Sequence, residues 1–175
     1  MSIHVGIFGP SMCGKSFVGK ALSREAWRRG RASLVCDPNG DEWGAQALVF
    51  PTLDERFRRV FWARKNLSVF IDEATLTVAR DVELIDLFTR GRHQGHQLFV
   101  LGHRAVNLLP IMRDQFGTLF LFRCSPSDAK LWAEDWGEPR ILEATGLPQY
   151  EFILARKFAA PDGQHLVTRG RFPAS

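Results

Sequence analysis

The sequence predicts an α/β fold in which helices cover both faces of a mainly parallel sheet. Short apolar runs with the length of buried strands alternate with segments of helical periodicity, an order typical of a three-layer α/β domain. At 175 residues the chain has the length of a single domain, which we place at 1–175. Two late strands within 150–170 are interpreted as a hairpin extension at the C-terminal end of that domain.

A glycine-rich loop follows the first apolar run, at 5–8. Four residues separate Gly9 from Gly14, and Lys15 and Ser16 come next, which is the spacing of a phosphate-binding loop (Walker A motif). Backbone N–H groups would face the phosphates, Lys15 would neutralise them, and the Ser16 hydroxyl would hold Mg²⁺. A helical pattern at 17–29 supplies the context that the motif needs. The expected nucleotide-binding residues are Gly9, Pro10, Ser11, Met12, Cys13, Gly14, Lys15, Ser16 and Phe17.

An acidic pair, Asp72 and Glu73, ends a second buried-strand pattern at 67–71. Two carboxylates beside a core are costly unless they have a partner or a function. Next to a phosphate loop they have one, because Asp72 can hold Mg²⁺ through water and Glu73 can orient or deprotonate the attacking water (Walker B motif). The sequence therefore predicts ATP hydrolysis with Mg²⁺, and it places this strand beside the strand of the phosphate loop.

The strand at 97–101 ends at Gly102, His103 and Arg104, which we expect near the terminal phosphate. Asp37 follows another strand and has two interpretations, a residue near the nucleotide and a turn-forming residue, of which we favour the second. The remaining expected elements are strands at 32–36, 47–50 and 118–122, helices at 53–65, 81–90 and 106–116 (broken by Pro110), and a helix with Ser127 as its N-cap.

Composition narrows the classes of function. The net charge of +4 (23 basic against 19 acidic residues) is compatible with a polyanionic partner, and equally with a solvated surface. The three scattered cysteines form no CxxC pair for zinc or redox chemistry, which suits a reducing cytoplasm. No apolar run approaches the roughly 18 residues of a membrane span, and no signal peptide is seen, so we expect a soluble cytoplasmic protein without a membrane segment.

Several residue groups keep two interpretations. His93, His96 and His103 resemble metal ligands but lack carboxylate support, and we favour no zinc site. Trp132 and Trp136, at helical spacing, fit a core or a subunit interface better than base stacking. Basic residues on a predicted helix and on the late strands either contact DNA or are simply solvated; they are Arg56, Arg59, Arg64, Arg156, Lys157, Arg169 and Arg171.

The segment GRHQGHQLFVLGHRA at 91–105, together with LSVFIDEA and GPSMCGKS, resembles the FtsK/HerA superfamily of ring-forming DNA-pumping ATPases over about residues 3–125. Within it the chain is similar to small viral genome-packaging ATPases and to zonula occludens toxin-like phage proteins. The resemblance implies a RecA/FtsK-like P-loop NTPase. It also implies that Arg92, with Arg90 as second candidate, acts on the nucleotide of a neighbouring subunit. His103 stands where the superfamily usually has a glutamine that senses the γ-phosphate. Arg113 also matches a position that is often basic.

The resemblance implies a DNA translocase that fills a preformed viral capsid. Its expected partners are DNA, further copies of the chain in a hexameric ring, and capsid or portal vertex proteins. It would work in the host cytoplasm, with association with the virion as an alternative. Two other functions stay open. One is a nucleotide-dependent assembly or scaffold protein, in which Glu73 would be idle. The other is a nucleoside kinase similar to thymidine kinase, for which the cysteine-rich zinc lobe is missing.

Overall fold

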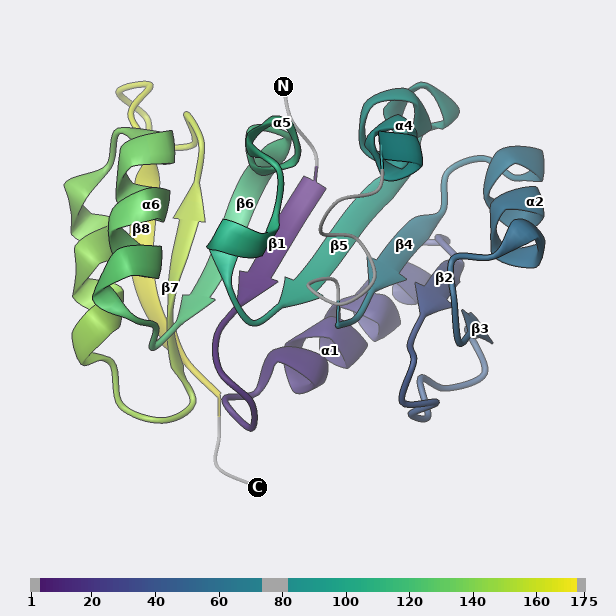
Figure 1. Ribbon diagram of the computed structural model, residues 1–175, viewed down its shortest axis with the longest axis horizontal. Coiled ribbons are helices and arrows are strands. Elements are labelled where there is room, and N and C mark those ends of the chain that lie inside the picture. The colour runs from purple at the N-terminus through teal and green to yellow at the C-terminus, as the bar shows by residue number, and fades with distance from the viewer. Residues whose placement is uncertain (1–3, 74–81, 173–175) are drawn as a thin grey trace.

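The computed structural model describes residues 4–73 and 82–172, and within them eight strands form one sheet (Figure 1). The strands lie side by side in the order β3-β2-β4-β5-β1-β6-β7-β8. Their bounds are β1 His4–Phe8, β2 Ser33–Cys36, β3 Ala47–Phe50, β4 Ser68–Ile71, β5 Gln97–Gly102, β6 Phe116–Phe122, β7 Glu151–Arg156 and β8 Leu166–Arg171.

The six strands from β3 to β6 in this order are parallel, and β7 and β8 add to the sheet antiparallel. The prediction of a mainly parallel sheet is confirmed. One detail of it is wrong: β4, which carries the acidic pair, does not neighbour β1, because β5 lies between them and pairs with both. Parallel strands end at the same edge of a sheet, so the loops after β1, β5 and β4 meet there in that order.

Helices cover both faces of the sheet (Figure 1). Successive residues of β1 point to opposite faces, so Ile7 and Phe8 belong to two different core clusters. Val18 of α1 packs in the cluster of Ile7, whereas Phe57 of α2 and Trp132 of α6 pack in that of Phe8. The helices are α1 Lys15–Arg28, α2 Glu55–Ala63, α4 Val82–Arg90, α5 Pro110–Arg113 and α6 Pro126–Trp136, with 3₁₀ helices η1 Gly91–Gln94, η2 Ala105–Asn107 and η3 Pro139–Gly146.

Two helix predictions need correction. The helix expected at 106–116 is a 3₁₀ turn followed by the short α5, and Pro110 begins α5 instead of breaking a longer helix. Proline lacks an N–H group and fits the first turn, where that group would have no helical partner. The N-cap of α6 is Ser125 and not Ser127: the Ser125 hydroxyl accepts a hydrogen bond from the backbone N–H of Asp128 at 3.2 Å. The tryptophans of α6 are buried, as the core interpretation expected.

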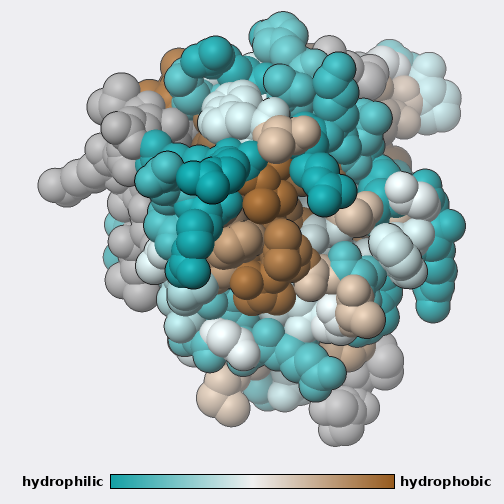
Figure 2. All heavy atoms as spheres, turned by 90° about the vertical axis from the view of Figure 1, so that its right-hand side faces the viewer, coloured by the Kyte–Doolittle hydropathy of each residue, from teal (hydrophilic) through white to brown (hydrophobic). Residues whose placement is uncertain are grey.

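The sheet ends at β3, and the surface beside it is apolar. A groove of about 320 Å³ runs between β3 and α2, and Leu48 at its wall is 50% exposed. Figure 2 shows this face, where an apolar patch is surrounded by hydrophilic side chains. An edge strand with an apolar surface is a place where another chain can pack.

None of the helices among residues 4–73 and 82–172 is long and apolar enough to cross a bilayer.

Candidate nucleotide site

The loop between β1 and α1 has the backbone that the glycine spacing predicts. A Cβ atom on Gly9 would come within 2.6 Å of the Phe122 Cβ atom, so only glycine fits there. Gly14, at φ +111°, adopts a conformation that side chains disfavour and forms the N-cap of α1. No side chain of the described residues caps this end of α1. Its first N–H groups are therefore available to an anion.

Lys15 is buried under the loop that it follows. Its Nζ atom donates hydrogen bonds to the carbonyl oxygens of Gly9 at 2.9 Å and Pro10 at 2.8 Å. The ammonium group thus holds the loop in a closed turn. A phosphate oxygen in the loop would compete for the same three donors, and bonds between ions are about twice as strong as those to neutral acceptors.

Ser16 and Asp72, the two predicted Mg²⁺ ligands, are in contact. The Ser16 hydroxyl donates to Asp72 Oδ2 at 3.3 Å, and the backbone N–H of Glu73 donates to Oδ1 at 2.8 Å. Burial raises the pKa of Asp72 above its usual range, and the hydrogen bond from Glu73 opposes that shift. A hydroxyl and a partly desolvated carboxylate are oxygen ligands of the kind that Mg²⁺ prefers, so the residues fit this ion.

His103 contacts the predicted catalytic carboxylate directly. Its Nε2 atom lies 2.9 Å from Glu73 Oε2 and 3.2 Å from Oε1. Glu73 has a φ of +50°, a left-handed conformation that non-glycine residues adopt at a cost and that is frequent at functional sites. The sequence placed both residues near the terminal phosphate but did not predict their contact.

An open cleft of about 610 Å³ adjoins the first half of the loop. Pro10, Ser11 and His103 form one wall, and Arg104 and Arg123 contribute two cations. Arg104 is tied to Asp128, with Nε 3.0 Å from Oδ2, whereas Arg123 is exposed and makes no ion pair with the described residues. Sequence reasoning assigned Arg123 no role. The signal was available, because Arg123 follows a buried strand just as Asp72 does.

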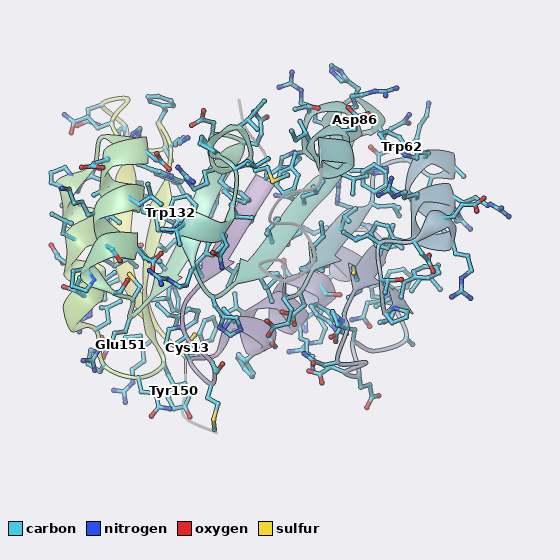
Figure 3. All side chains as sticks on the ribbon, viewed as in Figure 1. Cys13, Trp62, Asp86, Trp132, Tyr150 and Glu151 are labelled. Atoms are coloured by element: carbon cyan, nitrogen blue, oxygen red, sulfur yellow. The ribbon has the colours of Figure 1, made fainter. Side chains whose placement is uncertain are left out.

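A smaller hollow of about 310 Å³ adjoins the second half of the loop. Met12, Phe17 and Tyr150 surround it together with the backbone from Gly14 to Ser16. Figure 3 shows Tyr150 beside Cys13 of the loop, in agreement with a Tyr150 ring atom 3.8 Å from the place of a Cβ on Gly14. Nothing in the local sequence around Tyr150 predicts this position.

Arg92 is not part of the site of its own chain. It lies in η1, before β5, at the edge of the sheet opposite to the phosphate loop (Figure 1). The six residues of β5 span about 20 Å at roughly 3.3 Å per residue. The guanidinium of Arg92 is exposed and makes no hydrogen bond or ion pair with the described residues, and only the backbone carbonyl accepts a bond, from the Gly95 N–H at 3.0 Å. Arg90 is engaged, by Asp86 at 3.1 Å and by the Trp62 ring at 5.5 Å.

Asp37 is a turn residue, as the favoured interpretation expected. Its buried carboxylate accepts hydrogen bonds from the backbone N–H groups of Asn39 at 2.8 Å and Asp41 at 3.0 Å, and from Trp43 Nε1 at 2.9 Å. All three donors belong to the loop that follows β2. The side chain is therefore committed to this loop.

Two histidines are structural. Nδ1 of His96 accepts from the backbone N–H of Leu67, and Nε2 donates to the Phe61 carbonyl, which leaves no nitrogen for a metal. His4 makes the same pair of contacts, accepting from Leu98 and donating to Phe88. No cluster of three or more His, Cys, Asp or Glu side chains that could hold a metal occurs in residues 4–73 and 82–172.

The basic residues predicted either to contact DNA or to be solvated fall into two groups, those that are exposed and those that are held by a neighbouring side chain. Arg156 and Arg171 are exposed, whereas Arg169 pairs with Glu151. Lys157 lies 4.9 Å from the Trp136 ring centroid, and burial lowers its pKa. On α2, Arg56 pairs with Asp54, Arg59 pairs with Glu55, and Arg64 is exposed. Arg113 is buried and donates to Asp135 and to the Leu108 carbonyl, which is a structural role.

Comparison with known proteins places the fold. No protein-family model matches the chain, and no curated protein matches it in sequence. Among solved structures, B204, the DNA-packaging ATPase from Sulfolobus turreted icosahedral virus, is similar with a TM-score of 0.74 at 17% identity, over 99% of this chain and 98% of that one. The chain has the fold of a P-loop NTPase.

Two further structures agree. The genome-packaging NTPase B204 from Sulfolobus turreted icosahedral virus 2, in complex with AMPPCP, has a TM-score of 0.76 at 17% identity, again over 99% and 98% of the two chains. The N-terminal domain of zonular occludens toxin from Neisseria meningitidis has a TM-score of 0.58 at 13% identity, over 99% and 96%. The resemblance to FtsK/HerA-type P-loop ATPases that the sequence indicated is thus confirmed as a likeness of fold.

Proposed function

We propose that the protein is an ATP-hydrolysing DNA translocase that pumps a viral genome into a preformed capsid. The observation that carries the proposal is the contact of His103 with Glu73 beside a phosphate loop whose Ser16 meets Asp72. A phosphate loop, a hydroxyl and carboxylate suited to Mg²⁺, and a second carboxylate to position water are the parts that support hydrolysis of a nucleoside triphosphate. A fold similar to B204 over nearly the whole length of both chains supports the packaging role.

Each residue of the site has a task in this proposal. Lys15 exchanges its two carbonyl contacts for phosphate oxygens, and the N–H groups at the start of α1 bind the same phosphates. Ser16 and Asp72 would hold Mg²⁺, which supplies charge neutralisation at the β and γ phosphates. Glu73 orients the attacking water and accepts its proton.

His103 positions Glu73 and can donate a hydrogen bond to the terminal phosphate when the carboxylate turns towards water. In this role it replaces the glutamine that the superfamily usually has. Arg123, from the same subunit, adds a positive charge in the cleft that contains His103. Arg92 of a neighbouring subunit adds a further positive charge, at the place where negative charge builds up on the transferred phosphoryl group.

The position of Arg92 supports a ring. The arginine lies at one edge of the sheet and the phosphates would bind at the other, so in this proposal Arg92 completes the site of a neighbouring subunit. The apolar groove beside β3 is one surface that such a contact between subunits could cover. A hexamer is our expectation, with DNA bound through phosphate contacts to exposed cations such as Arg156 and Arg171. The capsid or portal vertex proteins are the expected docking partners, and the host cytoplasm or the virion is the expected location.

The proposal is tested by steady-state ATP hydrolysis with Mg²⁺. The assay is run with no addition, with double-stranded DNA, with single-stranded DNA and with thymidine, at low and moderate salt. DNA-stimulated turnover that fades with added salt is the expected result, because phosphate contacts release counterions. Lys15→Ala is the matched control, since it removes the phosphate-binding cation.

Other results would point to the alternatives. ADP production that depends on thymidine would contradict the translocase and support a nucleoside kinase. ATP binding without turnover in every condition, capsids included, would support a scaffold protein in which Glu73 is idle.

A further inference from the structure

The triphosphate must lie along the loop in one direction. Glu73 and His103 stand beside the first half of the loop, at Pro10 and Ser11, so the terminal phosphate has to face that side. The nucleoside then leaves towards the second half, where the hollow of about 310 Å³ lies. This step rests on the proposed function, because it uses Glu73 as the residue that faces the attacking water.

Aromatic and thioether side chains wall this hollow. Met12 is 85% exposed and Phe17 is 49% exposed, so both offer apolar surface to a ligand in the hollow. The third member, Tyr150, comes from the segment before β7 and approaches the loop at Gly14. Exposed apolar groups that face one hollow are suited to a flat ring.

Contacts with Phe172 hold Phe17 and Tyr150 in place. The Phe17 ring makes an edge-to-face contact with Phe172, with centroids 5.3 Å apart, and the Phe172 N–H donates to the Tyr150 carbonyl at 3.1 Å. Tyr150 has a φ of +65°, a strained conformation for a residue with a side chain. The fold therefore keeps Tyr150 beside the loop although its backbone conformation is unfavourable.

No Asn, Gln, Asp or Glu side chain is among the described residues that line the hollow. A protein distinguishes bases by hydrogen bonds to the base edges. Asn, Gln, Asp and Glu side chains make the most selective hydrogen bonds to an adenine edge. Stacking on aromatic rings tolerates every base, because each base has a π-face. The walls of the hollow supply stacking and leave the base edge unread.

We propose that Met12, Phe17 and Tyr150 form a nucleobase site that binds by stacking and that the enzyme accepts all four ribonucleoside triphosphates. Purines bind more tightly than pyrimidines because they offer the larger stacking surface. The energy source of the motor is then the whole nucleoside triphosphate pool.

The test compares binding and turnover of ATP, GTP, CTP and UTP with binding of inorganic tripolyphosphate, which has no base. Isothermal titration calorimetry gives the affinities, and phosphate release gives kcat and KM. The variants are Tyr150→Ala, Phe17→Ala at an exposed position, and Tyr150→Phe as the matched control that keeps the ring. Thermal unfolding of each variant confirms that it is folded.

In the wild-type protein we expect kcat/KM values within about tenfold for the four nucleotides. Tyr150→Ala and Phe17→Ala should weaken nucleotide binding by about 5- to 100-fold, the range of one lost stacking contact. Their affinity for tripolyphosphate should stay unchanged, and Tyr150→Phe should behave like the wild type.

Three results would overturn the inference: a preference for ATP above about 100-fold over the other three nucleotides, an equal loss of tripolyphosphate binding in the alanine variants, or unchanged nucleotide affinity in both. Different results would refute the proposed function. If nucleotides bind with the expected pattern but are not hydrolysed, the base site stands and the ATPase proposal falls. If neither nucleotide nor tripolyphosphate binds, both fall.

Discussion

Replacing Arg92 by alanine tests whether the site is completed by a neighbouring subunit. The guanidinium of Arg92 is exposed, makes no hydrogen bond or ion pair with the described residues of its own chain, and is about 20 Å from the phosphate loop along β5. An arginine supplied from a neighbour to a phosphoryl-transfer site accounts for about 10³- to 10⁵-fold in kcat. Arg92→Ala rings should therefore bind nucleotide normally and hydrolyse it at the background rate.

Mixing two inactive proteins should restore activity. An Arg92→Ala subunit keeps its own Glu73, and a Glu73→Gln subunit keeps its own Arg92. A productive site needs an Arg92→Ala subunit, which supplies Glu73, beside a Glu73→Gln subunit, which supplies Arg92. In a random equal mixture this arrangement has a probability of about one quarter, whatever the ring size. Turnover per subunit should rise to about a quarter of the wild-type value at equal amounts and fall symmetrically on either side.

The assay is phosphate release over a series of mixing ratios, after conditions that let subunits exchange. Arg90→Ala is the matched control, because this nearby arginine is engaged by Asp86 and Trp62. It should leave turnover close to wild type on its own. If no ratio of the two inactive proteins restores activity while native mass spectrometry shows mixed rings, the arginine does not act between subunits.

Four further predictions concern single residues. Glu73→Gln should keep ATP affinity but lose about 10²- to 10⁴-fold in kcat, and near-normal turnover would remove this carboxylate from the mechanism. His103→Gln, which can still donate to Glu73, should keep kcat within about tenfold, whereas His103→Ala should lose about a hundredfold; equal losses would show that a hydrogen bond to Glu73 is not what this position contributes. Asp37→Ala leaves the buried Trp43 Nε1 donor without an acceptor and frees two backbone N–H groups of the exposed loop, so chemical denaturation should show a loss of about 1–3 kcal/mol, more than for Asp37→Asn. Burial lowers the pKa of His4 and His96, so the free energy of unfolding should be highest above about pH 6.5 and fall as the pH drops below it, by up to about 2.7 kcal/mol per pH unit for the pair. His→Gln variants should flatten that slope, and an unchanged slope would show that other groups cause it.

The phosphate loop could be predicted from the sequence because its chemistry is local. The loop needs glycine where a Cβ would strike Phe122 at Gly9 and where φ is positive at Gly14, and those needs fix a spacing that can be recognised in one line of sequence. The acidic pair could be predicted for a related reason. A buried strand that ends in carboxylates is costly without a partner, and Ser16 is the partner of Asp72.

The features that the sequence did not predict depend on which strand lies next to which. Inserting β5 between β1 and β4 is what brings His103 to Glu73, 30 residues away in the chain. Tyr150 reaches Gly14 only because β7 adds to the far side of β6, a pairing that no local pattern specifies. The sequence predicts a helix at 106–116 that Pro110 breaks, whereas the structure uses the same proline to begin α5, because a proline fits the first turn of a helix.

The two edges of the sheet explain why an isolated subunit should be a poor ATPase. At one edge Glu73 is held by His103, so the carboxylate is partly occupied until a terminal phosphate offers His103 another partner. At the opposite edge Arg92 has no phosphate within its own chain to act on. We expect assembly around nucleotide to remove both deficits, the first through the ligand and the second through the neighbour. The informative quantity is therefore the ratio of turnover in assembled rings to turnover in dilute subunits. If the rate per subunit did not depend on protein concentration across the assembly range, the separation of Arg92 from the phosphate loop would have no catalytic meaning.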